Sequence, residues 1–400
     1  MDGRDHFDVV VVGGGPAGAT AAAELAARGR SVLLLDRAGR IKPCGGAIPP
    51  RLVRDYAIPE AIICARINCA RIVAPSAKHV DMHIDGGYVA MVDREVFDEF
   101  LRERAAERGA VRRTGRFLRI SRDAGGLATV HFRSGTEAAG TLIDDSVTAR
   151  MVIGADGANS MVARQEIAGG DRMRCVFAYH EIVRAPEGSD EVFDPRRCDV
   201  HYDGRYSPDF YSWVFPHGKT ASIGTGTLHK GFGLRESVAA FRRKTGLDGL
   251  ETIRREGAPI PLKPLKRWDN GRDVIVTGDA AGVVAPASGE GIYYAMASAS
   301  RVAEAVEEAL ATGRTKALSM ARSRFMKAHG RVFMILGIMQ WFWYRNDRLR
   351  ERFVSICADK DVQRLTWQSY MHKELVRQSP VAHVRIFFKD LGHLLGLART

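Results

Sequence analysis

The stretch that decides the fold is Asp8-Val9-Val10-Val11-Val12 followed by Gly13-Gly14-Gly15-Pro16-Ala17-Gly18. The apolar run predicts a buried strand, the glycines predict a tight turn, and the Ala-rich segment after them predicts a helix. Glycines at such a turn let backbone N–H groups approach a pyrophosphate at the positive end of the helix. The sequence therefore predicts a Rossmann-like α/β lobe that binds a dinucleotide.

An acidic residue follows the turn at the spacing that a dinucleotide site requires. The next apolar segment, Ser31-Val32-Leu33-Leu34-Leu35, ends in Asp36, about 20 residues beyond the turn, where a carboxylate can accept hydrogen bonds from a ribose. Arg37 comes next and fits three roles: a contact to a 2′-phosphate, a stacking partner of the adenine, or a surface residue. Because strand, turn, helix and acid agree, a nucleotide site is favoured over a glycine turn without a ligand.

Two motifs farther along the chain indicate FAD rather than NAD. Gly154-Ala155-Asp156-Gly157 is the first, and Gly278-Asp279-Ala280-Ala281-Gly282, after an apolar strand, is the second. The Asp279 carboxylate can bind the ribityl chain of a flavin, and the helix expected from Tyr293 to Leu310 can stabilise negative charge on a reduced flavin ring with its N-terminus. We therefore predict bound FAD, held by Gly13, Gly15, Pro16, Ala17, Gly18, Asp36, Arg37, Asp279, Gly289, Gly291 and Ile292.

Length, cysteine content and the N-terminal residues limit the class of protein. A chain of 400 residues can form a large core with two lobes and an extension. Its six cysteines include no Cys-x-x-Cys pair, so we expect reduced thiols. No His or Cys cluster has metal-ligand spacing, so we expect no metal. The polar segment Met1–Asp5 predicts no secretory signal and therefore a cytoplasmic protein.

Positive charge and tryptophan gather in the last quarter of the chain. The sequence has 59 Lys and Arg against 47 Asp and Glu, a net charge of +12, and residues 301–400 hold 18 basic and 9 acidic residues, or +9 of that total. The same quarter contains an apolar run of 13 residues, 332–344, which is too short to span a bilayer. Beside this run lie four arginines: Arg345, Arg348, Arg350 and Arg352.

Two interpretations of this quarter stay open. The apolar run with its aromatic end and basic neighbours is typical of a helix at a membrane interface. It also fits a buried core helix that precedes a solvated basic segment. We expect no nucleic-acid partner, because no recognition motif accompanies the charge.

The order of the expected elements indicates an interrupted α/β (α+β) fold. We expect a discontinuous FAD-binding domain in residues 1–70, 93–168 and 266–318. Residues 71–92 and 169–265, rich in strands and turns, are expected to form an antiparallel β-sheet substrate domain. Residues 319–400 are expected to be a helical C-terminal extension that faces a membrane.

Two further motifs carry chemistry. In Pro208-Asp209-Phe210-Tyr211-Ser212-Trp213-Val214-Phe215-Pro216, alternation along a strand points Tyr211, Trp213 and Phe215 to one face. Such an aromatic row offers the apolar area that a polyprenyl chain buries, and it also suits an ordinary sheet core. In Lys42-Pro43-Cys44-Gly45-Gly46, the two glycines let the backbone lie against a flat cofactor, while Cys44 is either a chemical group or a small apolar one.

Together these motifs resemble those of geranylgeranyl reductases, within the FAD superfamily that includes p-hydroxybenzoate hydroxylase and flavin halogenases. Residues 208–216 match the P-x-x-Y-x-W-x-F-P motif of geranylgeranyl reductases residue for residue, and residues 42–50 resemble their Cys-Gly loop, which approaches the isoalloxazine ring. Arg94, the first residue of a helix that we expect from Arg94 to Arg108, matches an Arg that reaches FAD in this superfamily. The whole chain resembles the branch that converts the geranylgeranyl tail of chlorophyll or bacteriochlorophyll to phytyl, notably in segments 91–98, 337–344 and 384–391.

The resemblance implies a flavoprotein that uses NADPH to reduce isolated prenyl double bonds. It implies substrate contacts at Tyr211, Trp213 and Phe215, and proton donation by Cys44, Tyr211 or an ordered water. The implied further FAD contacts are Cys44, Gly45 and Arg94. The substrate would be a prenylated pigment or free geranylgeranyl diphosphate. The enzyme would sit at the cytoplasmic face of a photosynthetic membrane, near other enzymes of pigment synthesis.

Three alternatives stay open at this point: a flavin monooxygenase or halogenase of the same fold, a reductase of another polyprenyl lipid, and a flavin-binding membrane adaptor without catalysis. Halogenases carry Trp-x-Trp-x-Ile-Pro where this chain has residues 211–216, which argues against halogenation.

Overall fold

The computed structural model describes residues 5–37, 41–135 and 142–373, which form two compact units. Of these described residues, those within 1–42, 94–175 and 259–333 form the first unit, and those within 43–93, 176–258 and 334–400 form the second. The mixed α/β architecture confirms the expected fold class. The limits of the FAD-binding and substrate domains expected from the sequence remain a prediction. The resemblance at 384–391 lies outside the described residues.

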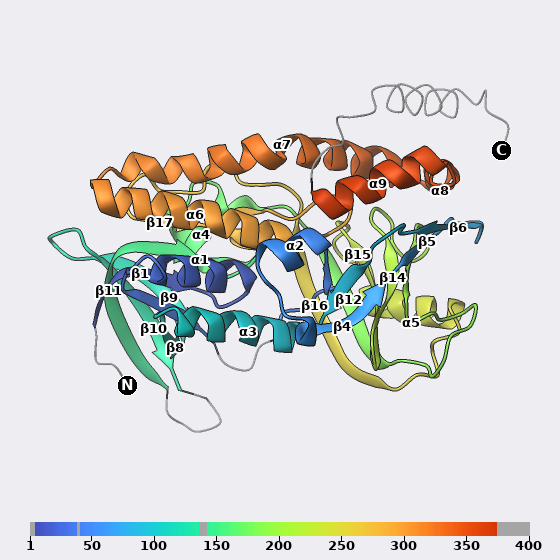
Figure 1. The fold of residues 1–400 in the computed structure, drawn as a ribbon, viewed down its shortest axis with the longest axis horizontal. Helices are drawn as coiled ribbons and strands as arrows, with labels where there is room; N and C mark the ends of the chain where they lie inside the picture. Colours follow the sequence, from blue (N-terminus) through green and yellow to red (C-terminus); the bar gives the residue numbers. More distant parts are fainter. Residues whose placement is uncertain (1–4, 38–40, 136–141, 374–400) are drawn as a thin grey trace. The chain divides into compact units, whose positions relative to one another are not determined.

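A seven-stranded sheet forms the centre of the first unit, in the order β8-β2-β1-β11-β10-β9 with β17 beside β11 (Figure 1). Strands β8, β2, β1, β11 and β17 pair in parallel, and β10 and β9 extend the sheet in antiparallel pairs. Strands β1, β2 and β17 are largely buried, as continuous apolar runs in such sheets are, whereas the edge strand β8 is partly exposed. The strands are β1 (His6–Val12), β2 (Val32–Asp36), β8 (Val111–Thr114), β9 (Arg116–Arg122), β10 (Ala128–Ser134), β11 (Ile143–Gly154) and β17 (Val274–Val276).

Helix α1 (Pro16–Ala26) begins directly after the glycine turn, and Pro16 suits its first turn because the proline ring fixes φ near the helical value. Nearly all of its small side chains are buried, so α6 (Ile292–Thr312) and α3 (Arg94–Glu107) can approach it closely. Both partner helices confirm sequence predictions to within two residues at each end. The unit also contains α4 (Met161–Glu166) and the first part of α7 (Leu318–Trp343).

The second unit contains a seven-stranded sheet, β16-β12-β15-β14-β13-β5-β6, and a small sheet, β3-β7-β4. Most strand pairs of the large sheet are antiparallel, as expected, but β13 and β5 pair in parallel. These two strands lie far apart in the sequence, so no hairpin fixes their relative direction. The strands are β3 (Ala47–Ile48), β4 (Ile63–Ile67), β5 (Cys69–Val73), β6 (His79–His83), β7 (Val89–Val92), β12 (Cys175–Arg184), β13 (Arg197–His201), β14 (Ser212–His217), β15 (Thr220–Thr227) and β16 (Thr252–Pro261).

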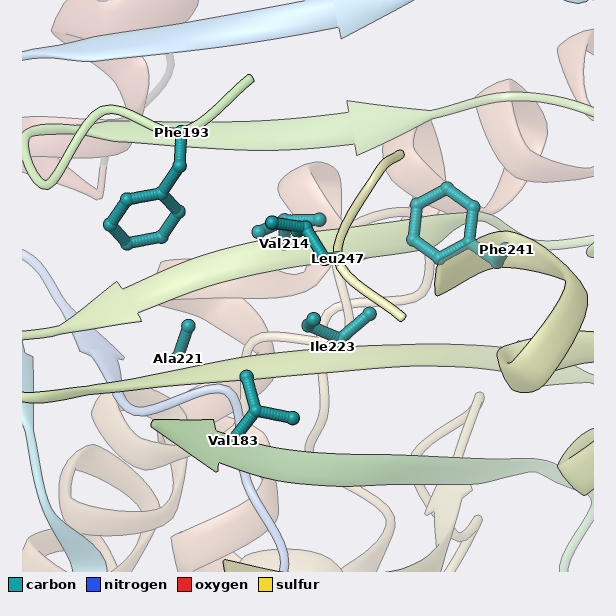
Figure 2. Packing of buried hydrophobic residues seen from close by; sticks show 7 residues of the cluster. All are labelled: Val183, Phe193, Val214, Ala221, Ile223, Phe241 and Leu247. Atoms are coloured by element: carbon teal, nitrogen blue, oxygen red, sulfur yellow. The ribbon is translucent and has the colours of Figure 1, made fainter. Parts of the chain in front are cut away.

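One face of the large sheet in the second unit packs against helix α5 (Leu234–Lys244). Figure 2 shows the cluster that fills this layer, in which side chains of β12, β14 and β15 meet Phe241 of the helix. All seven residues are almost fully buried: Val183, Phe193, Val214, Ala221, Ile223, Phe241 and Leu247. Because side chains alternate along a strand, Trp213 and Phe215 point to the opposite face of β14 from Val214.

As far as residue 373, where the description of the chain ends, the C-terminal part of the second unit is helical, as predicted, and contains the end of α7, α8 (Asp347–Ile356) and α9 (Lys360–His372). Helix α2 (Pro50–Asp55) contacts α9. Arg350 of α8 is 1% exposed and donates hydrogen bonds to the carbonyl oxygens of Pro208 and Tyr344, the latter at 2.7 Å. This buried arginine ties the C-terminal helices to the first residue of the aromatic motif.

A histidine in β13 gives the fold a pH dependence. Burial lowers the pKa of His201 to about 4, from an ordinary value of 6.5, so the folded state binds this proton less readily than the unfolded state. Its contribution to stability is complete above about pH 6.5 and is lost as the pH falls toward about 4. Between about pH 7 and about pH 5, urea denaturation should show a steeper loss of unfolding free energy for the wild type than for His201→Gln, by at most about 1.4 kcal/mol per pH unit. Equal losses would contradict the lowered pKa.

Candidate functional site: a dinucleotide cradle and an aromatic strand

The glycine turn and the second motif pack backbone against backbone in the first unit. Gly13 has φ of +105°, and a Cβ there would lie 2.4 Å from the carbonyl oxygen of Ala155. A Cβ on Gly18 would lie 1.7 Å from the carbonyl oxygen of Gly13. Both positions therefore require glycine. At Gly15, which precedes α1, a Cβ would meet only Arg94, at 4.0 Å, so this side of the turn is open to a ligand.

Asp36 lies against the same turn, as the sequence predicted. A Cβ on Gly14 would lie 2.7 Å from the Asp36 carboxylate, so the acid touches the turn backbone. Burial raises the pKa of Asp36, opposed by a hydrogen bond from the Gly14 backbone and by the charge of Arg102. Arg102 of α3 donates to the Gly14 carbonyl oxygen at 3.3 Å and to Asp36 at 3.5 Å. Sequence analysis missed Arg102, although it lies two helical turns beyond Arg94 on the same face.

The third motif joins this arrangement through helix α1. Gly278 has φ of +61°, and a Cβ there would lie 2.7 Å from the Cβ of Ala17. The next residue, Asp279, is 9% exposed and pairs with the ammonium of Lys42, to which sequence analysis assigned no role. A Cβ on Gly291 would lie 3.6 Å from Asp279 Oδ1, which brings the start of α6 to the same carboxylate. Segments near residues 15, 155, 279 and 291 are thus gathered in one unit.

Other residues that the sequence analysis named also take clear places. Arg94 is 5% exposed and forms two hydrogen bonds with Asp98, at 2.8 and 2.7 Å, close to the open side of the turn. Arg37 is exposed, and Gly289 has φ of +66° in the turn before α6, which begins at Ile292. The Asp156 carboxylate accepts hydrogen bonds from Ser160 and from the backbone at the start of α4. Its role in the structure is to cap that helix.

These features fit a dinucleotide. The turn presents backbone N–H groups at the start of a helix of 11 residues, an acid stands beside it, and a second buried carboxylate stands beside the start of α6. Among the described residues, no group of three His, Cys, Asp or Glu side chains could hold a metal ion. All six cysteines are free thiols.

In the second unit the aromatic motif forms a continuous row along and just before β14. The ring centroids of Tyr211 and Trp213 are 5.9 Å apart, and those of Trp213 and Phe215 are 6.1 Å apart. Tyr211 and Trp213 are buried, and Phe215 is partly exposed. The row therefore has the geometry that period-two alternation predicted.

The Cys-Gly loop lies on this row, within the same unit. A Cβ on Gly45 would lie 3.1 Å from the Phe215 ring, and a Cβ on Gly46 would lie 2.5 Å from Nε2 of His217. Both glycines thus allow the loop backbone to touch β14, and the Cys44 sulfur accepts a hydrogen bond from the Gly46 N–H at 3.4 Å. Sequence analysis missed His217. Burial lowers the pKa of His217, and its Nδ1–H donates to the Phe215 carbonyl oxygen at 3.0 Å.

Comparison with known proteins decides the family. The model of the lycopene cyclase protein family matches residues 8–384, so the chain falls within that wide family. The geranylgeranyl diphosphate reductase of Rhodobacter capsulatus is 54% identical over 391 residues, which cover 98% of each chain. This chain belongs to the geranylgeranyl diphosphate reductase family.

Other members and a solved structure agree with this geranylgeranyl diphosphate reductase assignment. The chloroplastic geranylgeranyl diphosphate reductase of Arabidopsis thaliana is 36% identical over 97% of this chain and 85% of its own. A geranylgeranyl bacteriochlorophyll reductase-like protein from Thermoplasma acidophilum, 22% identical, superposes with a TM-score of 0.79 over 95% of this chain and 100% of its own. Flavin-dependent halogenases and monooxygenases share this fold of the p-hydroxybenzoate hydroxylase type.

The buried carboxylate of the third motif generates a prediction about the cofactor. Asp279→Ala should weaken FAD binding roughly ten- to a hundredfold, because a hydrogen bond to a charged group contributes about 1.5–3 kcal/mol. The measurement is the flavin content per chain and the dissociation constant on reconstitution with FAD. The control is Asp144→Ala, which removes an exposed ion pair with Arg133 in the same unit and should leave the flavin bound. A wild-type protein that cannot be reconstituted with FAD would contradict the whole assignment of the cradle.

Proposed function

We propose that this protein is an FAD-dependent reductase that uses NADPH to reduce the isolated double bonds of a geranylgeranyl group, yielding a phytyl group. The aromatic row under the Cys-Gly loop is the observation that carries the proposal. It occurs in a chain 54% identical to a geranylgeranyl diphosphate reductase. Each double bond reduced would consume one NADPH and one proton, and would release one NADP⁺. The flavin-dependent neighbours of the same fold support the flavin.

The first unit would hold the cofactor. The open side of the turn at Gly15 would face the pyrophosphate, with Gly13, Pro16, Ala17 and Gly18 shaping the turn and helix start. Asp36 would accept from the adenosine ribose, Arg94 would reach the phosphates, and Asp279 would bind the ribityl chain. Bound FAD would supply the hydride acceptor and donor that no side chain provides. Arg37 and the residues 289–292 complete the proposed contacts.

The second unit would hold the prenyl chain. An isoprenoid offers no hydrogen-bonding groups, so its binding depends on apolar area of the kind that Tyr211, Trp213 and Phe215 present. A side chain on Gly45 would meet the Phe215 ring, so glycine at this position lets the loop backbone lie against this end of the row. An isolated alkene is a poor hydride acceptor, so alignment by this row would supply much of the rate enhancement.

A proton must reach the second carbon of each alkene. The Cys44 thiol and the Tyr211 hydroxyl are the candidate donors on this chain, and an ordered water is the alternative. His217 is held as a neutral imidazole next to the Cys-Gly loop, since burial lowers its pKa. We propose the pigment-linked tail and free geranylgeranyl diphosphate as substrates in chlorophyll or bacteriochlorophyll synthesis, because chloroplastic relatives carry the reductase name.

The test of this activity uses purified holoprotein with geranylgeranyl diphosphate or a geranylgeranylated pigment. NADPH oxidation should depend on the prenyl substrate and should consume no oxygen. A monooxygenase would consume oxygen, and a non-catalytic flavin protein would show no substrate-dependent oxidation. Either result would overturn the proposal.

Removing the centre of the aromatic row should impair prenyl turnover without releasing the flavin. Trp213→Ala deletes a side chain that can bury about 150–250 Å², so we expect kcat/KM for geranylgeranyl diphosphate to fall at least about tenfold. Val214→Ala is the matched control, because this neighbour points into the opposite core. Loss of FAD with unchanged prenyl affinity in Trp213→Ala would assign the row to structure alone.

We also propose that the end of α7 docks on a membrane surface. Met334, Ile335, Ile338 and Trp341 are exposed at helical spacing, with Trp341 67% exposed. The Arg345 guanidinium lies 5.6 Å from the centre of the Trp341 ring, so a cation accompanies the exposed apolar face. No helix within the described residues is long and apolar enough to cross a membrane.

The four arginines beside this stripe do not share one role. Arg345 and Arg348 are exposed, but Arg350 is buried and hydrogen-bonded to the backbone, so it cannot meet headgroups as the sequence suggested.

The Arg345→Gln/Arg348→Gln variant should therefore bind anionic vesicles roughly thirtyfold more weakly, at about 1 kcal/mol per charge. Sedimentation with vesicles at low salt measures this effect. Arg172→Gln/Arg184→Gln, an equal loss of charge at exposed sites, should bind as the wild type does. Equal binding by both variants would contradict docking through this stripe.

A further inference from the structure

A buried chain of hydrogen bonds ends on the central tryptophan of the aromatic row. The indole Nε1 of Trp213 donates to Ser222 Oγ at 3.0 Å, and Ser222 Oγ lies 2.7 Å from Nδ1 of His180. On the other side of the imidazole, Nε2 lies 3.1 Å from Oε2 of Glu256. Ser222 is fully buried, and His180 is 3% exposed. The chain runs from β16 through β12 and β15 to β14, within the second unit.

When the imidazole is neutral, the hydrogen bonds of this network can run in only one direction, because each donor must face an acceptor. An indole N–H can only donate, and an ionised carboxylate can only accept. Nε2–H of His180 then donates to Glu256, Nδ1 accepts from the Ser222 hydroxyl, and the Ser222 oxygen accepts from Trp213. Each polar side-chain group in this hydrogen-bond network therefore has a partner, which a buried network requires. Glu256 is itself ion-paired with Arg254.

The order Ser, His, Glu invites a comparison with hydrolytic triads, but the geometry excludes that role. The Ser222 hydroxyl is fully buried and is covered by the Trp213 indole, so no acyl group can reach it. The chain is equally unsuited to deliver a proton to an alkene, because its inner end is an indole N–H, which is not acidic at neutral pH.

The remaining role is to hold a ring in place. A Cβ on Gly224 would lie 2.4 Å from Cζ2 of Trp213, so the six-membered part of the indole lies directly on the β15 backbone. Ser222, two residues earlier on the same strand, accepts a hydrogen bond from the indole N–H. The ring is therefore fixed at two points of β15, by contact at one and by a hydrogen bond at the other.

We propose that Ser222, oriented by His180 and Glu256, is a positioning residue that sets the plane of the Trp213 ring and thereby the register of the prenyl chain along the aromatic row. This inference rests on the proposed prenyl reductase function. Because several double bonds of one geranylgeranyl group must be presented in turn, a mobile indole should let the chain rest out of register. Partly reduced products should then accumulate.

A double-mutant cycle with geranylgeranyl diphosphate and FAD-loaded protein tests the inference. Ser222→Ala should lower kcat/KM roughly three- to tenfold in the Trp213 background, in keeping with the loss of one hydrogen bond. It should have no further effect in Trp213→Phe, which has no N–H to position. Partly reduced products should increase in Ser222→Ala but not in Ser212→Ala, a fully buried hydroxyl that belongs to the opposite face of β14. If Ser222→Ala does not fold, Ser222→Cys supplies a near-isosteric weak acceptor for the same cycle.

A second measurement does not depend on turnover. In protein labelled with ¹⁵N-tryptophan, the indole resonance that is missing from Trp213→Phe should lose its protection from exchange in Ser222→Ala. An unchanged resonance, or equal losses of kcat/KM in both Trp213 backgrounds, would overturn the positioning role while leaving the proposed function intact. A wild-type protein that does not reduce the prenyl substrate would instead overturn the proposed function itself.

Discussion

The close backbone contact between the glycine turn and the end of β11 is the constraint on which the first unit depends. Gly13 touches the Ala155 carbonyl, and Gly18 touches Gly13, with no room for a Cβ at either position. This contact sets the start of α1 above the carboxyl ends of parallel strands, where open α/β sheets bind their ligands. Asp36, Arg102 and Asp279 lie in the same unit, on β2, on α3 and on the short helical turn after β17.

In the second unit, one face of the large sheet packs into a core, and the other face is the proposed binding surface. Toward α5 its side chains are aliphatic and closely packed, which stabilises the unit. The other face of β14 and β15 combines aromatic rings with two glycines, Gly224 and Gly226, and with the buried hydrogen-bond chain. A prenyl ligand requires apolar area, but a reaction at one defined bond also requires rigid walls. The hydrogen-bond network behind Trp213 would supply that rigidity to the proposed site.

Arg350 shows why charge in a sequence is an incomplete guide to location. It lies among exposed arginines beside an apolar run, and composition alone assigns all of them to one basic surface. In the fold it donates to backbone carbonyls just after α7 and at Pro208, where an apolar side chain would leave these acceptors unpaired. It therefore joins the C-terminal helices to the aromatic motif, while Arg345 and Arg348 stay at the surface.

The sequence by itself determined the elements whose chemistry is local. The glycine turn, the acid after β2, the helices from residues 94 and 292 and the alternation in residues 211–215 follow from period, spacing and backbone freedom. Those rules act within a few residues. Family membership was also visible in these short motifs.

Only the tertiary structure decided which distant residues meet. Lys42 pairs with Asp279, Arg102 holds the glycine turn, His217 lies under the Cys-Gly loop, and His180 reaches Trp213 through Ser222. The parallel pairing of β13 with β5 is likewise a contact between segments that are far apart in the sequence. Each of these contacts joins segments from different parts of the chain. A single Lys, Arg, Ser or His belongs to no periodic pattern, so the sequence does not show which distant residue it will contact. Long-range packing, not local propensity, fixes them.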